Sequence, residues 1–225
     1  MRRFTLADFL LIITGQMNLF LTGTDTDVGK TYVAALLVRA LRAQGVDAVG
    51  LKPLCCGGRE DAEVLHAASG GVIPLNDVNP VWLRAPAAPY AAAMIENRTI
   101  DLALIRETFA RLRAAHAAVI VEGVGGWRVP ITRDFFVSDL AAEFALPVAV
   151  VVANRLGALN HTLLTIESIR ACGLECAGLI LNHTAPPDSG PDLAVSTNRG
   201  ILEDVAGVRI LAEIGYGQTE LPNFF

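Results

Sequence analysis

The 225-residue sequence lacks several features that would place it in common functional classes. A membrane helix needs about 18 consecutive apolar residues, and the longest apolar run here, residues 146–153, has only the length of a strand. No segment rich in Pro and Ser or in charge divides the chain. Its 23 acidic and 18 basic side chains, with a net charge of −5, are scattered and form no cationic segment. These features argue against a membrane span and a nucleic-acid partner, and they favour a single domain.

The sequence also lacks the cysteine spacing of a zinc site. Cys55 and Cys56 are adjacent, and neighbouring cysteines rarely bridge each other. The other two cysteines, Cys172 and Cys176, complete no metal-binding pattern. We therefore expect reduced thiols and a cytoplasmic protein.

The N-terminal 16 residues resemble a secretion signal only faintly. Arg2 and Arg3 precede an apolar segment, but Asp8 interrupts it and no small-residue cleavage site follows. We expect residues 1–16 to be a loose leader or an upstream start, and residues 17–225 to form a single domain.

Short apolar runs alternate with helical patterns along the chain. Such runs are typical of strands buried on both faces of a parallel sheet. The segments 55–59 and 74–89 contain Gly or Pro and are expected to form a flexible turn and an irregular wall. The alternation predicts an α/β fold with a doubly wound, mainly parallel sheet and right-handed crossovers. We expect strands at 18–22, 47–53, 118–122, 147–153, 175–182 and 208–213, and helices at 32–41, 60–68, 100–115, 161–172 and 192–205.

The stretch from Gly23 to Thr31 reads GTDTDVGKT and lies between an expected strand and an expected helix. Backbone N–H groups around such a loop converge on one concavity, which suits a phosphate chain with Lys30 beside it and the Thr31 hydroxyl on Mg²⁺. Five residues separate Gly23 and Gly29, whereas the usual phosphate loop has four. A simple turn and helix start is the alternative interpretation.

Three charged residues are expected near the carboxyl ends of strands, where open parallel sheets bind ligands. Lys52 ends the second strand, and its alternative role is a solvated lysine. Asp61 begins a helix and is either a metal ligand or a partner of the helix dipole. Glu122 ends a buried strand before a glycine cluster, which is how nucleotide enzymes hold Mg²⁺, although it is alternatively an acid that faces water.

The segment from Gly157 to Asn160 precedes an expected helix. Its N–H groups either cap that helix alone or bind an anion such as a carboxylate, and Asn160 is a plausible N-cap.

Three motifs together resemble the dethiobiotin synthetases, ATP-dependent enzymes of biotin biosynthesis in the P-loop NTPase superfamily. They are residues 23–31, the pair Lys52-Pro53, and Val121-Glu-Gly-Val-Gly-Gly126. The resemblance extends over nearly the whole chain from Met17, and the five-residue gap of the first motif is typical of this family. It implies a cyclo-ligase in which 7,8-diaminononanoate takes up CO₂ as a carbamate, ATP phosphorylates it, and the second amine closes the ureido ring. It also implies ATP as co-substrate, Mg²⁺, and a homodimer with the active site at the interface.

The resemblance further assigns roles to individual residues. Lys30, Lys52 and Thr26 are the implied catalytic residues. The metal ligands would be Thr31, Asp61 and Glu122. The nucleotide would contact Asp27, Val28, Gly29, Lys30, Thr31, Glu122 and, at adenine, Asn182. The substrate would contact Thr26, Lys52, Cys56 and, from the neighbouring subunit, Gly157, Ala158, Leu159 and Asn160.

The sequence departs from the family at Cys56, where a hydroxyl residue is usual. A thiol is a weaker donor, so its substrate contact is less secure. Two other functions remain open at this point: a related ATP-dependent amide-forming synthase, which would need a glutaminase, and a nucleotide-switch ATPase, which would carry an extra lysine near Gly23.

Overall fold

A computed structural model describes residues 18–186 and 192–221. The expectation for residues 1–16 lies outside this range. Six parallel strands form the central sheet in the order β10-β9-β8-β1-β5-β2. Their bounds are β1 Leu19–Gly23, β2 Ala48–Leu51, β5 Ala118–Glu122, β8 Val148–Ala153, β9 Cys176–Asn182 and β10 Ile210–Ile214.

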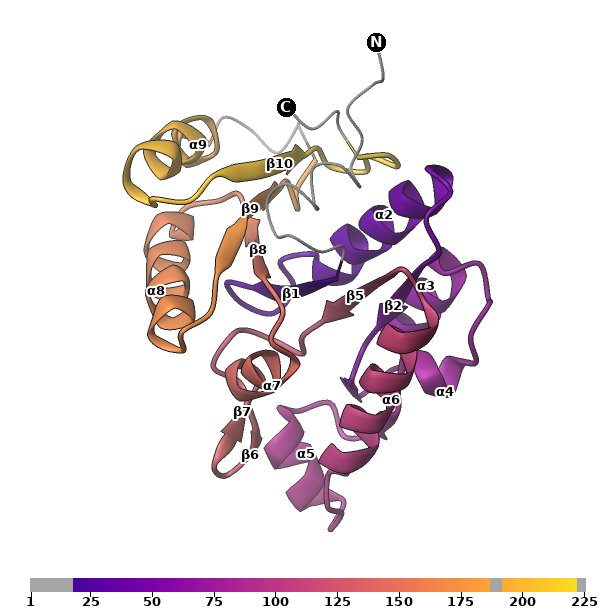
Figure 1. Cartoon of the computed structure of the whole chain (residues 1–225). Coiled ribbons are helices and arrows are strands. Elements are labelled where there is room, and N and C mark those ends of the chain that lie inside the picture. The colour runs from indigo at the N-terminus through magenta and orange to yellow at the C-terminus, as the bar shows by residue number, and fades with distance from the viewer. Residues whose placement is uncertain (1–17, 187–191, 222–225) are drawn as a thin grey trace.

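Helices cover both faces of this sheet (Figure 1). Two of them, α2 and α3, pack on β2 and on each other, while α6, α7 and α8 lie on the opposite face. The larger helices are α2 Lys30–Ala43, α3 Glu60–Ala68, α6 Leu102–Ala115, α7 Val137–Phe144, α8 Ala158–Ala171 and α9 Leu193–Val205. The predicted doubly wound α/β sheet is therefore confirmed.

The central strand β1 lies between β5 and β8. The next strand along the chain, β2, lies on one side of β1, and the later strands β8, β9 and β10 lie on the other side. Every residue of β1, β5 and β8 is buried, because helices cover the sheet on both faces. A parallel sheet opens a crevice beyond the carboxyl ends of its strands where the winding reverses. This topology brings the loops that follow β1, β2 and β5 to one edge.

Two segments are more ordered than the sequence indicates. The expected turn at 55–59 is wrong in part, because β3 Leu54–Cys56 pairs in parallel with β4 Val81–Leu83. The segment 74–89, expected to be irregular, contains α4 Leu75–Val78 and β4, and α5 Pro89–Ile95 begins at its end. The reason is Asn79, whose buried amide donates to the carbonyls of Lys52 and Val81 at 2.9 and 2.8 Å.

Other elements confirm or extend the expectations. A short hairpin, β6 Pro130–Thr132 and β7 Phe135–Phe136, precedes α7 in a region for which no element was expected. The four cysteines carry free thiols, as predicted. Within the described ranges, no helix is long and apolar enough to cross a membrane.

Candidate active site

The loop between β1 and α2 has the backbone geometry of an anion-binding nest. Asp27 and Gly29 adopt left-handed conformations with φ of 57° and 87°, and Gly29 is the N-cap of α2. The Thr24 N–H donates to the Val151 carbonyl at 3.0 Å, which fixes the start of the loop on β8. Alternating backbone conformations of this kind turn successive N–H groups toward one point. The loop thus places left-handed residues at the start of a helix, a geometry that suits an anion such as phosphate.

Lys30 lies buried beneath this loop. Its Nζ donates to the carbonyl oxygen of Asp25 at 2.8 Å. Burial, together with the nearby ammonium of Lys52, lowers the pKa of Lys30 to about 8. A weakly solvated ammonium that donates to a backbone carbonyl can exchange that partner for an anion.

Lys52 is the centre of a buried charge cluster, although the sequence left open a solvated lysine. Its Nζ lies 2.5 Å from Glu122 Oε1 and 2.7 Å from Asp61 Oδ2. The Thr31 hydroxyl donates to the same Glu122 oxygen at 2.7 Å. The residues come from the end of β2, the first turn of α3, the end of β5 and the start of α2. The structure therefore brings together the four side chains that the sequence placed at separate strand and helix ends.

Mutual contacts set the charges in this cluster. Burial alone would lower the pKa of Lys52, but the carboxylates of Glu122 and Asp61 raise it above its ordinary value. Burial would raise the pKa of Asp61, yet the Lys52 ammonium and the Thr31 hydroxyl lower it. Burial raises the pKa of Glu122 while Lys52 opposes this. Lys52 is consequently a fixed positive charge at neutral pH.

The oxygen atoms around Lys52 fit a magnesium ion. Glu122 Oε2 is buried and makes no hydrogen bond within the described part of the chain. Thr31, Asp61 and Glu122 offer a hydroxyl and carboxylates, the hard donors that Mg²⁺ prefers. No three His, Cys, Asp or Glu side chains are grouped to hold a metal in residues 18–186 and 192–221. A metal here would therefore depend on the Thr31 hydroxyl in addition to the two carboxylates.

A cavity of about 1150 Å³ opens above the phosphate loop and the charge cluster. Lys30, Thr31, Lys52, Asp61 and Glu122 line its floor. Its walls include Pro86–Pro89, Val124–Val129, and Leu164, Thr165 and Ser168 of α8. The volume is that of a site for small molecules of moderate size.

Thr26 and Cys56, both predicted substrate contacts, also line this cavity. Thr26 is exposed, and its hydroxyl and N–H both donate to Asp25 Oδ1. Cys56 ends β3, and burial followed by the charge of Glu96 raises the pKa of its thiol to about 11. The thiol is therefore neutral and offers at most a weak hydrogen bond.

Asn182 lies behind the phosphate loop, at the end of β9, and is not part of the cavity wall described above. Its Nδ2 donates to the Val28 carbonyl at 2.9 Å. Its Oδ1 is buried and has no hydrogen-bond partner among the described residues. A Cβ added at Gly29 would overlap the side-chain amide of Asn182, so a larger residue here would require Asn182 to shift.

The start of α8 differs from the expectation. Gly157, with φ of 90°, is the N-cap, and Asn160 lies within the first turn of the helix, so the predicted Asn160 cap is wrong. A glycine reaches the left-handed conformation without strain, which moves the helix start three residues earlier. Residues 157–160 are not part of the cavity wall within this one chain.

Sequence comparison with known proteins identifies the family. The ATP-dependent dethiobiotin synthetase BioD of Akkermansia muciniphila is 46% identical over 201 residues, covering 89% of this chain and 93% of the relative. The protein of the same name from Anaeromyxobacter dehalogenans is 52% identical over 175 residues, covering 76% and 78%. The chain belongs to the dethiobiotin synthetase family.

Broader comparisons support the fold. The AAA domain family matches residues 17–219. Chloroplast FtsY from Physcomitrella patens superposes with a TM-score of 0.58 at 15% identity, covering 93% of this chain and 62% of that one. At this identity the likeness concerns the P-loop α/β fold alone, and the chain spans less than two thirds of that neighbour.

Sequence reasoning missed some residues that line the site in this dethiobiotin synthetase family member. Trp127 and Arg128 follow the glycine cluster, in a segment that the sequence left without a role. The Trp127 ring packs edge to face against Phe20 of β1, with centroids 6.4 Å apart. The one available signal was their position a few residues beyond Glu122, on the loop that follows a central strand.

Proposed function

We propose that this protein is an ATP- and Mg²⁺-dependent cyclo-ligase that forms the ureido ring of dethiobiotin from 7,8-diaminononanoate and CO₂. The observation that carries the proposal is the position of Lys52, fixed between Glu122 and Asp61 and close enough to lower the pKa of Lys30. Two lysines and two carboxylates at one phosphate loop suit a reaction that joins several anions. The names of the curated relatives support the same reaction.

The proposed reaction has three steps. One amine of the substrate adds to CO₂ and loses a proton, which gives a carbamate. A carbamate oxygen attacks the γ-phosphorus of ATP, and the bond to ADP breaks, leaving a carbamic-phosphoric anhydride. The second amine then attacks the carbonyl carbon, loses a proton, and expels phosphate to close the ring.

The two lysines have different roles in this proposal. Lys30 would leave the Asp25 carbonyl and bind phosphate oxygens beside the loop amides of Asp27, Val28 and Gly29. Lys52 cannot move freely because Glu122 and Asp61 hold it. Its charge would therefore already be oriented toward the carbamate and the transferring phosphoryl group, so little reorganisation is needed in the transition state. Thr26 and Cys56 would line the substrate side.

Thr31, Asp61 and Glu122 would hold the Mg²⁺ ion, and the unpartnered Glu122 Oε2 supports this assignment. When bound, the ion would neutralise charge on the phosphates. Asn182 would meet adenine if the base reaches behind the phosphate loop to the end of β9, where the buried Oδ1, without a partner among the described residues, would accept from an exocyclic amine.

The proposal also includes the localisation and the oligomeric state of the enzyme. We infer a cytoplasmic homodimer of single-domain chains, residues 17–225, with a leader at 1–16. In such a dimer the start of α8, residues 157–160, would reach the substrate of the neighbouring subunit.

A product assay tests the function. Purified protein is incubated with ATP, Mg²⁺, bicarbonate and 7,8-diaminononanoate, and the cyclic urea is measured by mass spectrometry. We expect product that requires all four components. ATP hydrolysis that is independent of the diamine, without the urea, would exclude the proposal and favour a nucleotide-switch ATPase.

A further inference from the structure

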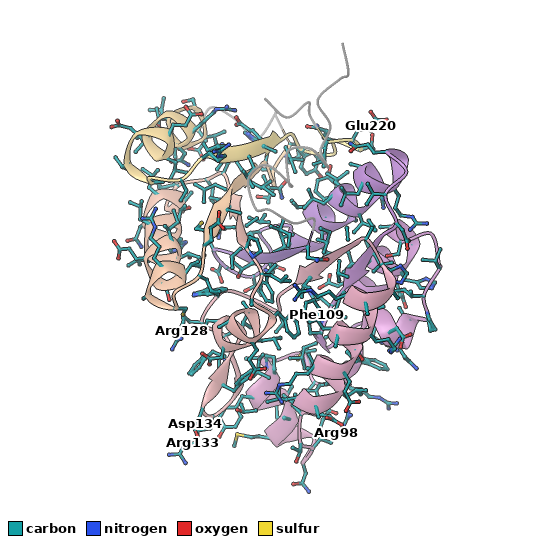
Figure 2. The ribbon with its side chains drawn as sticks, in the orientation of Figure 1. Arg98, Phe109, Arg128, Arg133, Asp134 and Glu220 are labelled. Carbon is teal, nitrogen blue, oxygen red and sulfur yellow. The ribbon has the colours of Figure 1, made fainter. Side chains whose placement is uncertain are left out.

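The cavity has an exposed rim and a floor of charged groups that contact one another. At the rim, Arg128 lies between α8 and the β6–β7 hairpin, away from the strands of the sheet (Figure 2). At the floor, Lys52 Nζ and Asp61 Oδ2 are 2.7 Å apart, although the two residues lie nine positions apart in the sequence. The chain between them includes Gly57, with φ of 83°, and Gly58. Because glycine permits many backbone conformations, this chain alone does not fix Asp61 relative to Lys52.

Asn79, at the junction of α4 and β4, holds the backbone of Lys52. Its side chain is 1% exposed, and its Nδ2 donates to the carbonyls of Lys52 and Val81 at 2.9 and 2.8 Å. The Lys52 N–H donates in turn to the Val78 carbonyl at 2.7 Å. Both backbone polar groups of Lys52 are therefore bonded to residues 78 and 79. These bonds fix the point from which the catalytic side chain extends.

Arg59 holds the start of α3 to the same residue. It is the N-cap of α3 and lies two positions before Asp61. Its Nε donates to Asn79 Oδ1 at 3.1 Å, its Nη2 donates to the Asn79 carbonyl at 3.0 Å, and its Cζ lies 5.3 Å from the centre of the Trp82 ring. The Asn79 amide thus joins the two sides of the floor, because its oxygen accepts from Arg59 while its nitrogen donates to Lys52.

We propose that Arg59 and Asn79 are positioning residues, which together set the distance between the Lys52 ammonium and the Asp61 carboxylate. Neither residue lines the cavity as the described part of the chain defines it, so both would act through Lys52 and Asp61. The inference rests on the proposed function, in which Lys52 faces the transferring phosphoryl group and Asp61 holds Mg²⁺. Loss of contacts that orient a metal ligand typically lowers metal affinity or activity by about 10- to 100-fold.

The test measures three constants for the wild type and for Arg59→Met. They are kcat for the cyclic urea, the affinity for ATP, and the affinity for Mn²⁺ in the presence of a non-hydrolysable ATP analogue, followed by electron paramagnetic resonance. We expect kcat and the Mn²⁺ affinity each to fall about tenfold. The affinity for ATP should fall less than about threefold, because Lys30 and the loop amides keep their positions. Urea unfolding confirms that each variant is folded in the assay.

A matched control is Arg111→Met, which removes another arginine bound to the same segment. Arg111, on α6, donates through Nη1 and Nη2 to the two carboxylate oxygens of Asp77 in α4, both at 2.8 Å. It makes this ion pair near the surface without a hydrogen bond to Asn79 among those of the described residues. Arg111→Met should therefore leave kcat and the Mn²⁺ affinity within about twofold of the wild type.

Asn79→Ala breaks the same link without a change of charge. It should cause the same losses as Arg59→Met, and the double variant should be no worse than the more damaging single variant, because the two residues act as one unit. If Asn79→Ala does not fold, Arg59→Met is compared at low salt and at about 0.5 M salt, where interactions between exposed charges are screened. A positional loss persists at high salt.

Four results would overturn the inference. They are a lower urea midpoint for Arg59→Met with wild-type kcat and Mn²⁺ affinity, equal losses for Arg111→Met, additive losses in the double variant, and a loss that disappears at high salt. A wild type that binds no Mn²⁺ beside the analogue would overturn it as well. If the wild type binds Mn²⁺ but makes no cyclic urea, the proposed function fails, while the Mn²⁺ comparison still decides whether Arg59 and Asn79 position Asp61.

Discussion

The floor and the rim of the cavity hold their charges in opposite ways. At the floor, Lys52 and Glu122 are almost fully buried, and Lys52 contacts two carboxylates. At the rim, Arg128 is exposed and has one side-chain hydrogen bond among the described residues. Buried charges are stabilised by ion pairs with one another, whereas exposed charges are largely solvated by water.

This difference indicates that the floor serves the chemical step and that the rim serves ligand recognition. A buried, fully partnered ammonium keeps one orientation, as a group that stabilises a transition state must. An exposed guanidinium with unused donors can accept and release a ligand. We therefore expect changes at the floor to affect kcat and folding, and changes at the rim to affect KM.

The strongest test is Lys52→Ala. Removing the ammonium should lower kcat by roughly a thousandfold, because its partner charge develops at the γ-phosphate in the transition state. The affinity for ATP should fall less than about fivefold, since Lys30 and the loop amides bind the ground state. Steady-state kinetics and ATP titration measure the two effects. Equal losses of kcat and of ATP affinity would show that Lys52 binds phosphate in the ground state. The floor would then serve in ligand binding, as we expect of the rim.

A second test concerns the stability of the floor. Lys52→Met leaves the buried carboxylate of Glu122 without its cation and should lower the free energy of unfolding by about 3 kcal/mol. Adding Glu122→Gln should restore at least half of that loss, because the uncompensated charge is gone. Urea unfolding without nucleotide or Mg²⁺ measures both. Arg128→Met at the rim should cost less than about 1 kcal/mol, and a larger cost would contradict the distinction.

Two glycines provide a matched pair, one in the phosphate loop and one at the start of α8. Gly29 and Gly157 both lie in the left-handed region, with φ of 87° and 90°, where alanine is strained. Of the two, Gly29 is the position at which a new Cβ would overlap another group, the side-chain amide of Asn182, whereas among the described residues nothing lies within 4 Å of a Cβ added at Gly157. We expect Gly29→Ala to cost about 2 kcal/mol more than Gly157→Ala in thermal or urea unfolding. Equal losses of unfolding free energy for the two variants would show that Asn182 of β9 shifts to accommodate the new Cβ.

The sequence predicted the parts of this site that depend on local pattern. The apolar runs of β1 and β5 and the Gly-Lys-Thr start of α2 have strong local signals, and each brings a site residue with it. That Lys30, Lys52 and Glu122 meet follows from a parallel sheet, whose strand ends share one edge. The contact of one lysine with two carboxylates required the folded structure.

What the sequence did not predict depends on distant contacts. The pairing of β3 with β4 relies on Asn79, whose amide holds carbonyls on both sides of a segment rich in Gly and Pro. No local signal marks Arg128, because its partners Phe136 and Ser138 lie on elements that the sequence left unassigned. At α8, side-chain preference favoured Asn160, but the left-handed conformation of Gly157 determined where the helix starts.

The smallest expected effect tests the start of α8, which lies outside the cavity wall of a single chain. Asn160 lies inside the first turn and is exposed, so Asn160→Ala should change the free energy of unfolding by less than about 0.5 kcal/mol. Asp101 is the matched control, because its carboxylate caps α6 by accepting from the Leu104 N–H at 2.9 Å. Asp101→Ala should cost about 1 kcal/mol in the same urea experiment.

A loss for Asn160→Ala as large as that for Asp101→Ala would restore Asn160 as a cap and contradict the observed helix start. If the variant instead keeps its stability, the same protein tests the proposed dimer. Its KM for the diamine should then rise while kcat stays constant, because residues 157–160 would act on the substrate of the neighbouring subunit and not on the chemistry at Lys52. An unchanged KM would limit the neighbour's role to backbone groups, which the side-chain truncation does not remove.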